Sequence, residues 1–245
     1  MIPPRVPQSD TEGAGDTVHD RAGRPALGIR AVWSECVRVA LRAPLTLAGP
    51  AFAIAAAADA LTLSTRHPVA EVAVAVAIFV LFELYVAYVE HVLIALEDRG
   101  PPVALAPVLA GTLASAAAII AAAVPGAIIE LVATALLVVP GLWLLTRWSL
   151  ASSVIACEHV GPLRALARSN ALVRGRTLAV FATATVAVLA QSALIDATAI
   201  GDDPLFGSLA VALVVSALVS ALVTPPAAII TSVIYTRLAV PADGG

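Results

Sequence analysis

Apolar residues occupy six long blocks of this chain, and short polar segments separate the blocks. The blocks cover residues 43–63, 69–96, 103–123, 127–156, 177–195 and 205–236. A helix needs about 20 apolar residues to cross the hydrocarbon core of a bilayer, so each block predicts a transmembrane helix. The third block ends at Val124-Pro125-Gly126, which we interpret as a turn. The pattern predicts an all-α polytopic membrane helical bundle with about six transmembrane helices.

Two further segments are amphipathic. In residues 28–42, apolar side chains recur every three or four positions, and arginines line the opposite face. The apolar positions are Ile29, Val32, Trp33, Cys36, Val37, Ala40 and Leu41, opposite Arg30, Ser34, Arg38 and Arg42. This pattern is typical of an interfacial helix in the headgroup plane, although a helix packed on other protein is the alternative. A second interfacial helix is predicted over residues 161–175, where Pro162 suits the first helical position.

Arginines gather on one side of the predicted topology. That side holds Arg5, Arg21, Arg24, Arg30, Arg38, Arg42, Arg99, Arg164, Arg168, Arg174, Arg176 and Arg237. The other side holds Arg66, and its last loop, residues 196–204, contains three aspartates. The positive-inside rule therefore predicts a multi-pass protein of the cell membrane with both termini in the cytoplasm.

Composition agrees with a membrane protein, because 60% of the residues are hydrophobic and 13% are charged. A soluble domain is nearer half apolar and a quarter charged. Residues 1–27, rich in Pro, Gly, Asp and Thr, predict a disordered cytoplasmic tail. Residues 28–240 then form a single membrane-embedded domain, and residues 241–245 form a short tail. The absence of lysine and the abundance of alanine suggest a prokaryotic source. Two cysteines, Cys36 and Cys157, are expected to be small packing residues.

An ordered set of motifs lies between Pro140 and Phe181. It comprises Pro140, Trp148-Ser149-Leu150-Ala151, Glu158, Gly161-Pro162, Ala165-Leu166-Ala167-Arg168-Ser169 and Leu172-Val173-Arg174-Gly175-Arg176. In this order the segment resembles the glycerophosphoryl diester phosphodiesterase membrane domain family and its uncharacterised six-span prokaryotic relatives. Pro225-Pro226 and Tyr235-Thr236-Arg237 also resemble the last span of that family. Asn170 departs from the family, which usually has an aromatic residue there.

The resemblance implies a multi-pass membrane module, which some family members join to a soluble phosphodiesterase domain. This sequence lacks a His-Arg start and a clustered set of Glu, Asp and His for metal-assisted phosphodiester hydrolysis. Its histidines are scattered: His19, His67, His91 and His159. We therefore expect no enzymatic activity, no metal and no cofactor.

Charged and polar side chains within the predicted spans are the next candidates for function. They are Glu83, Glu90, His91 and Arg147. Counting depth from the span centres places Glu90 and Arg147 at a similar level, and isolated charges are costly inside a bilayer. We predict that these two side chains pair or share a polar network. The network either fixes helix packing or serves a transport or proton pathway.

A second group of acidic residues falls towards the outer ends of the predicted spans. These residues are Asp59, Glu71, Glu130 and Asp196. We expect them to reach the outer headgroups and water, and a shared cation site is the alternative. Faces of small residues, such as Gly111, Ser115 and Ala118, are expected to let helices approach closely.

The inner loop between the fourth and fifth blocks carries Arg164, Arg168, Arg174 and Arg176. Each basic residue near an anionic leaflet contributes about 1 kcal/mol, so the loop predicts contact with anionic lipid headgroups. Topology anchoring alone and docking of a protein partner are the alternatives.

These observations favour an integral membrane protein without a catalytic domain that organises lipid or protein partners at the cytoplasmic face. A homo-oligomer is compatible with this hypothesis, whereas nucleic acid is not an expected partner. The alternative is a small transporter or permease component that uses Glu83, Glu90 and Arg147. A transporter should contain a polar cavity near mid-membrane that reaches Glu83, whereas a scaffold should be a packed bundle.

Overall fold

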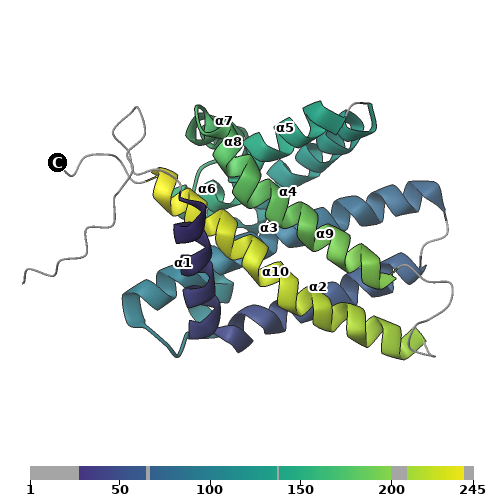
Figure 1. The fold of residues 1–245 in the computed structure, drawn as a ribbon, viewed down its shortest axis with the longest axis horizontal. Coiled ribbons are helices and arrows are strands. Elements are labelled where there is room, and N and C mark those ends of the chain that lie inside the picture. The colour runs from purple at the N-terminus through teal and green to yellow at the C-terminus, as the bar shows by residue number, and fades with distance from the viewer. Residues whose placement is uncertain (1–27, 65–66, 137, 200–208, 240–245) are drawn as a thin grey trace, which may run out of the picture.

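The computed structural model describes residues 28–64, 67–136, 138–199 and 209–239, and these residues form helices joined by short turns. In chain order the helices are α1 (Ile29–Arg42), α2 (Pro44–Ser64), α3 (Pro68–Arg99), α4 (Leu105–Leu136), α5 (Val138–Trp148), α6 (Ala151–Glu158), α7 (Pro162–Val173), α8 (Thr177–Val180), the π-helix η1 (Phe181–Thr185), α9 (Val186–Ala199) and α10 (Leu209–Ala239). The predicted all-α bundle is confirmed (Figure 1). The tails predicted at residues 1–27 and 241–245 lie outside the described residues.

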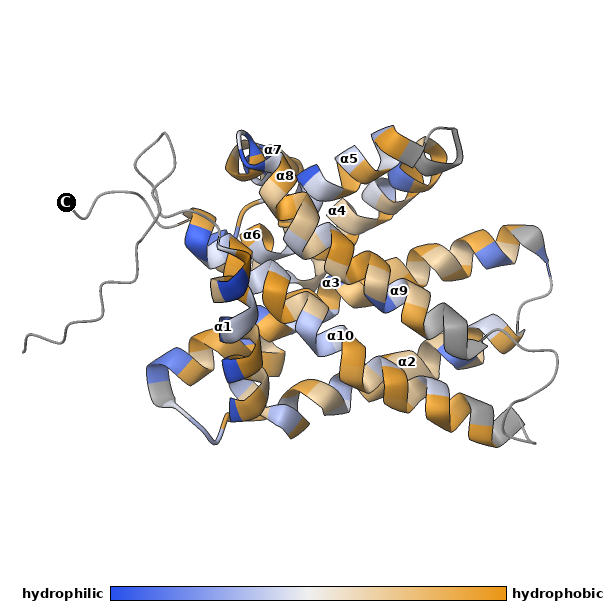
Figure 2. Cartoon of the chain, in the orientation of Figure 1, coloured by the Kyte–Doolittle hydropathy of each residue, from blue (hydrophilic) through white to orange (hydrophobic). Residues whose placement is uncertain are grey.

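Five of the described helices are long and apolar enough to cross a membrane. The qualifying stretches are Pro44–Leu63, Val69–Asp98, Leu105–Ala133, Thr177–Leu194 and Leu213–Ala239. Hydrophobic residues, coloured orange in Figure 2, predominate along these helices. Large side chains such as Leu45, Leu113 and Leu222 are 85%, 73% and 75% exposed on the bundle surface. Lipid is the solvent that suits such a surface, so the chain is an integral membrane protein.

The predicted turn at Val124-Pro125-Gly126 is wrong. Helix α4 continues from Leu105 to Leu136 with Pro125 inside it. Proline removes one backbone hydrogen bond, but in an apolar environment no water competes for the remaining ones, so the helix continues. With 32 residues, α4 is about 48 Å long, which exceeds the bilayer core of about 30 Å. Helix α5, which begins at Val138, packs back against α4.

The predicted fourth span, residues 127–156, is not one helix. It is divided among the end of α4, helix α5 and helix α6, and a turn at Ser149-Leu150 separates the last two. Helices α5 and α6 contain 11 and 8 residues, so each is too short to cross a bilayer core alone. Together they return the chain from the far end of α4 to the region where α7 and α8 lie (Figure 1).

Hydrogen bonds from α7 stabilise the break between α5 and α6. The buried Ser169 hydroxyl donates to the carbonyl oxygen of Arg147 at 2.8 Å and accepts from the backbone N–H of Leu150 at 3.3 Å. These backbone groups lie at a helix end and a helix start, where intrahelical partners are missing. The neighbouring Asn170 accepts a hydrogen bond from the Arg147 guanidinium. Two consecutive residues of α7 thus position the end of α5.

The two described ends of the chain lie together at one end of the bundle. Helix α1 packs against the end of α10 (Figure 1), and Arg237 Nη2 donates to the carbonyl oxygen of Ala31 at 3.2 Å. Within α1, Val32 is buried against the protein, whereas Trp33 and Leu41 are exposed. Half of its apolar face therefore packs on protein, and the other half is free to face lipid.

Cys36 of α1 is buried among the core residues, as expected for a small packing residue. Its thiol donates to the carbonyl oxygen of Pro226 at 3.6 Å. Burial raises the pKa of the Cys36 thiol to about 11. Because the thiolate is the reactive form, this cysteine is suited to packing and not to chemistry.

Candidate functional site

A large cavity lies between α2, α3, α5, η1, α9 and α10. Its volume is about 540 Å³, within the range of small-molecule sites. Apolar side chains, among them Ile78, Phe79, Phe82, Leu145 and Val188, form much of its wall. The polar side chains of the wall are Asp59, Thr62, Glu83, Ser149, Thr185, Gln191, Ser192 and Thr231. We call it the Asp59–Glu83 cavity.

Two acceptor atoms among the cavity-lining residues have no hydrogen-bond partner in the described part of the chain. They are Asp59 Oδ2 and Gln191 Oε1, and both are buried. The Gln191 amide nitrogen donates to Thr224 Oγ1 at 3.1 Å, which fixes the orientation of the amide. A buried acceptor without a donor is costly, so these two atoms are positions at which a ligand could donate a hydrogen bond or place a positive charge.

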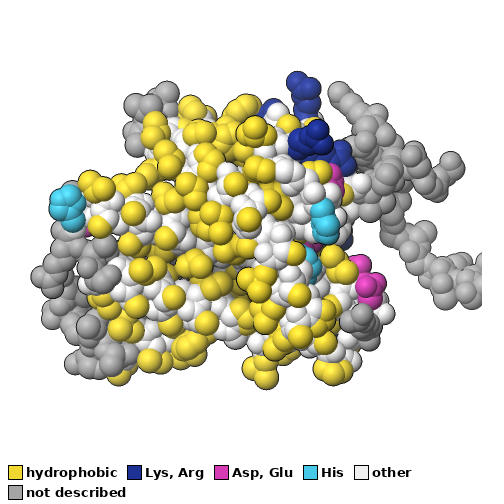
Figure 3. All heavy atoms as spheres, turned by 180° about the vertical axis from the view of Figure 1, so that it is seen from behind, with side chains coloured by type: hydrophobic (Ala, Val, Ile, Leu, Met, Phe, Trp, Pro, Cys, Tyr) yellow, Lys and Arg dark blue, Asp and Glu magenta, His cyan; other side chains and the backbone are white. Residues whose placement is uncertain are grey.

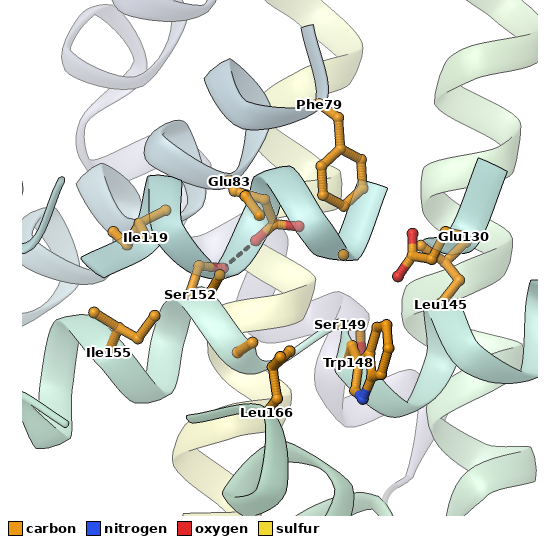
Figure 4. A pocket seen from close by; sticks show the side chains of 14 residues that line it. Phe79, Glu83, Ile119, Glu130, Leu145, Trp148, Ser149, Ser152, Ile155 and Leu166 are labelled. Carbon is orange, nitrogen blue, oxygen red and sulfur yellow. Dashed lines mark hydrogen bonds between the residues drawn. The ribbon is translucent and has the colours of Figure 1, made fainter. Parts of the chain in front are cut away.

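A second, smaller pocket adjoins the cavity at Glu83. Its volume is about 30 Å³, and Phe79, Glu83, Leu145 and Ser149 line both spaces. Figure 4 shows the carboxylates of Glu83 on α3 and Glu130 on α4 pointing into this pocket. Ser152 of α6 donates a hydrogen bond to Glu83. Glu83 therefore stands between the pocket and the cavity.

The acidic residues expected at the outer ends of the spans lie in different environments. Glu130 is only 9% exposed and lies near enough to Glu83 for the charge of Glu83 to act on it, so the expectation that it reaches headgroups is wrong. Asp59 lines the cavity. Glu71 is exposed at the start of α3, as expected. The side chain of Asp196 lies outside the described residues.

The structure also corrects the predicted pairing of Glu90 with Arg147. Arg147 donates to Asn170 of α7, and its guanidinium lies 4.3 Å from the centre of the Trp143 ring. Glu90 is 1% exposed and accepts a hydrogen bond from the Cys157 thiol at 3.9 Å. Depth counting fixes the level of a residue in the bilayer but not the direction in which it points, and Arg147 points towards α7.

Among the described residues, His91 has no hydrogen bond or ion pair with these charges. Its Nδ1 lies 2.8 Å from the carbonyl oxygen of Ala87, one turn earlier in α3. Its ring packs directly against Gly111 of α4, where a Cβ would approach His91 Cδ2 to 2.3 Å. The predicted close approach of helices at the small residue Gly111 is therefore present.

The four arginines of the predicted inner loop lie on or directly after α7. The side chains of Arg164, Arg168 and Arg174 are exposed. Arg168 pairs with Glu158 at 3.1 Å. Figure 3 shows arginine side chains gathered at one end of the molecule, the end where the described chain begins and stops.

Sequence reasoning missed Gln191 as a site residue. The residue interrupts an apolar run in the fifth block, and an amide within a transmembrane helix is a usable signal because it needs hydrogen-bond partners there. The π-helix η1 was also missed. It contributes Thr185 to the cavity wall, and the Thr185 hydroxyl lies 3.0 Å from that of Thr146 on α5. Such helices are frequent at functional sites.

No family model, no curated protein and no solved structure matches this chain. The likeness of residues 140–181 to the glycerophosphoryl diester phosphodiesterase membrane domain family stays a prediction. Within the described residues, no group of three or more His, Cys, Asp or Glu side chains could hold a metal ion.

Proposed function

We propose that this protein is a membrane transport protein whose Asp59–Glu83 cavity takes a small organic cation with an apolar body. The observation that carries the proposal is a cavity inside the bundle that has two carboxylates in its wall. No arginine, lysine or histidine stands among the described residues that line it. Asp59 Oδ2, which lacks a donor in the described chain, supplies a ready acceptor.

Electrostatics favours a cationic occupant. A carboxylate in an apolar site is costly without a partner, and a bound cation removes that cost. The rings of Phe79 and Phe82 in the same wall add an attraction for a cation at close range. The remaining apolar wall suits hydrocarbon groups around the charge, so an amine or quaternary ion with an apolar body fits best.

Irregular backbone beside the cavity supports transport in particular. Ser149 at the break between α5 and α6 and Thr185 in the π-helix both belong to the wall. Helix α10 carries Pro225 and Pro226 within its length. Broken helices around a binding site are a recurring feature of transporters, because their free backbone groups and helix ends contribute to the site.

The matched ions tetraphenylphosphonium and tetraphenylborate test the proposal, because they share one shape and carry opposite charges. We expect the purified protein to bind the cation at least about ten-fold more tightly than the anion, since like charges repel in a buried site. Asp59→Asn and Glu83→Gln should each weaken cation binding about ten-fold. Glu71→Gln, an exposed carboxylate on the same helix as Glu83, should leave binding unchanged. Equal binding of both ions, or an equal loss in the Glu71 variant, would overturn the proposal.

A second candidate function is the organisation of anionic lipids at the end of the bundle that carries α7. Exposed guanidinium groups at Arg164 and Arg174 lie close in sequence to Leu163 and Leu178, which are 81% and 85% exposed. Leucines in the acyl region below arginines at the headgroups are typical of an interfacial segment. Since the arginines and both ends of the described chain lie at this end of the bundle, this side would be cytoplasmic under the positive-inside rule.

Spin-labelled phosphatidylglycerol and phosphatidylcholine test this second function in reconstituted vesicles. We expect phosphatidylglycerol to be enriched beside the protein, and the double variant Arg164→Gln, Arg174→Gln to lose about five-fold or more of this preference. Arg38→Gln is the control, because Arg38 already pairs with Glu35 at 2.6 Å. An unchanged preference in the double variant would argue against lipid organisation by this loop.

A further inference from the structure

Glu90 sits in a buried polar cluster that the cavity does not include. Its side chain is 1% exposed, and Ser153 of α6 and Ser232 of α10 are both fully buried beside its carboxylate. Glu90 Oε1, Ser153 Oγ and Ser232 Oγ all lack a hydrogen-bond partner among the described residues. One oxygen of the Glu90 carboxylate and the two serine hydroxyls beside it are therefore unsatisfied, which is unusual in a packed interior.

The cluster and the cavity both lie along α3 and α6. Glu83 and Glu90 are seven residues apart on α3, so they share one face of that helix. Consecutive serines of α6 meet the two carboxylates, because Ser152 donates to Glu83 and Ser153 lies beside Glu90. Hydroxyl groups can accept one proton while they donate another.

The cluster is linked to the surface on its other side. The Cys157 thiol donates to Glu90 Oε2 at 3.9 Å, and the hydroxyl of Tyr235 on α10 lies beside that thiol. Tyr235 in turn donates to Glu158 Oε1 at 3.3 Å. Glu158, 28% exposed, pairs with the exposed Arg168. Polar groups therefore follow one another from Glu90 to the end of the bundle where α7 lies.

We infer that these groups form a proton path between the Asp59–Glu83 cavity and the surface pair Glu158–Arg168, with Glu90 as the residue that holds the proton. The inference deepens the proposed transport function and rests on it, because the path begins at the cavity. A proton that enters at Glu83 passes through the serine hydroxyls to the Glu90 carboxylate. The Glu90 carboxyl then gives its proton to the Cys157 sulfur as the thiol proton moves to the Tyr235 oxygen and the Tyr235 proton moves to Glu158, so each group is left with one proton exchanged for another.

Several titratable groups face Glu90 from the elements around it. Glu97 on its own helix acts on it electrostatically, and Cys157 lies opposite on α6. Tyr235 approaches from α10, and Tyr235 also contacts Glu158. No cation stands beside Glu90 among these described neighbours. A proton on the Glu90 carboxyl therefore removes a buried charge, which is the property that a proton-holding residue needs.

Proteoliposomes test the path directly. Vesicles that contain the protein and the internal pH dye pyranine receive a potassium diffusion potential through valinomycin, and the dye reports proton entry. We expect the natural protein to conduct protons and Glu90→Gln to slow this flux about 100-fold, towards that of protein-free vesicles. Tyr235→Phe, which keeps the ring and removes the hydroxyl, should slow the flux about ten-fold. Glu71→Gln is the control and should conduct like the natural protein.

Tetraphenylphosphonium binding, measured on the same samples, separates this inference from the proposed function. Normal cation binding with lost proton flux in Glu90→Gln supports the path. If the natural protein binds the cation but conducts no protons, the path is wrong and the cavity proposal stands. If Glu90→Gln loses cation binding through misfolding, Tyr235→Phe decides, and full flux in that variant contradicts the path.

Discussion

Replacing Ser169 by alanine is expected to lower the free energy of unfolding by about 2 to 4 kcal/mol. The hydroxyl serves two backbone groups at the break between α5 and α6, the carbonyl of Arg147 and the N–H of Leu150. Alanine satisfies neither group, and the side chain at this position is fully buried, so water cannot take its place. Each unsatisfied buried group costs about 1 to 3 kcal/mol. We expect α7 to separate from the end of α5 as a result.

Unfolding in mixed detergent, followed by tryptophan fluorescence, measures this loss, because Trp143 and Trp148 lie on α5 beside the break. Ser115→Ala is the matched control. The Ser115 hydroxyl bonds only to carbonyls of its own helix, at Gly111 and Thr112, so its removal should change stability by less than about 0.5 kcal/mol. If both variants lose the same stability, the two bonds of Ser169 do not hold the break together.

The helical fold could be predicted because apolar length is a strong signal in a lipid environment. The predicted blocks at residues 43–63 and 69–96 closely match the candidate spans of α2 and α3. The block at residues 177–195 matches the span that α8, η1 and α9 form together. The boundary between the third and fourth blocks could not be predicted. Proline is a weak helix terminator where no water competes for backbone groups, so Pro125 gave a misleading signal.

The candidate site was only partly predictable. Glu83 was identified from its position within an apolar block, and the structure places it between a cavity and a pocket. Asp59 and Glu130 do lie near the ends of α2 and α4, but hydropathy could not show that the Glu130 side chain is buried and that Asp59 lines the cavity. The partner of Arg147 was missed because Asn170 belongs to α7, which was expected to lie at the interface. Hydropathy cannot show that a short amphipathic helix folds back onto a broken one.

Gly111→Ala is expected to destabilise the packing of α3 against α4 by about 1 to 3 kcal/mol. A Cβ at this position would approach His91 Cδ2 to 2.3 Å and Nε2 to 2.5 Å, so the imidazole must move. Movement of the ring breaks its contact with the carbonyl oxygen of Ala87. Thermal unfolding of the purified protein in detergent measures the loss.

Two further variants show whether His91 causes this loss. In a His91→Ala background, Gly111→Ala should cost almost nothing, so the double-mutant cycle should return a coupling energy of about 1 to 3 kcal/mol. Gly126→Ala is the control on the same helix, because no atom lies within 4 Å of its Cβ position. Alanine is the better helix former, so this control should be neutral or stabilise α4 by up to about 1 kcal/mol. A zero coupling energy would mean that α3 and α4 separate easily at this point, and that the small residue is not needed for their contact.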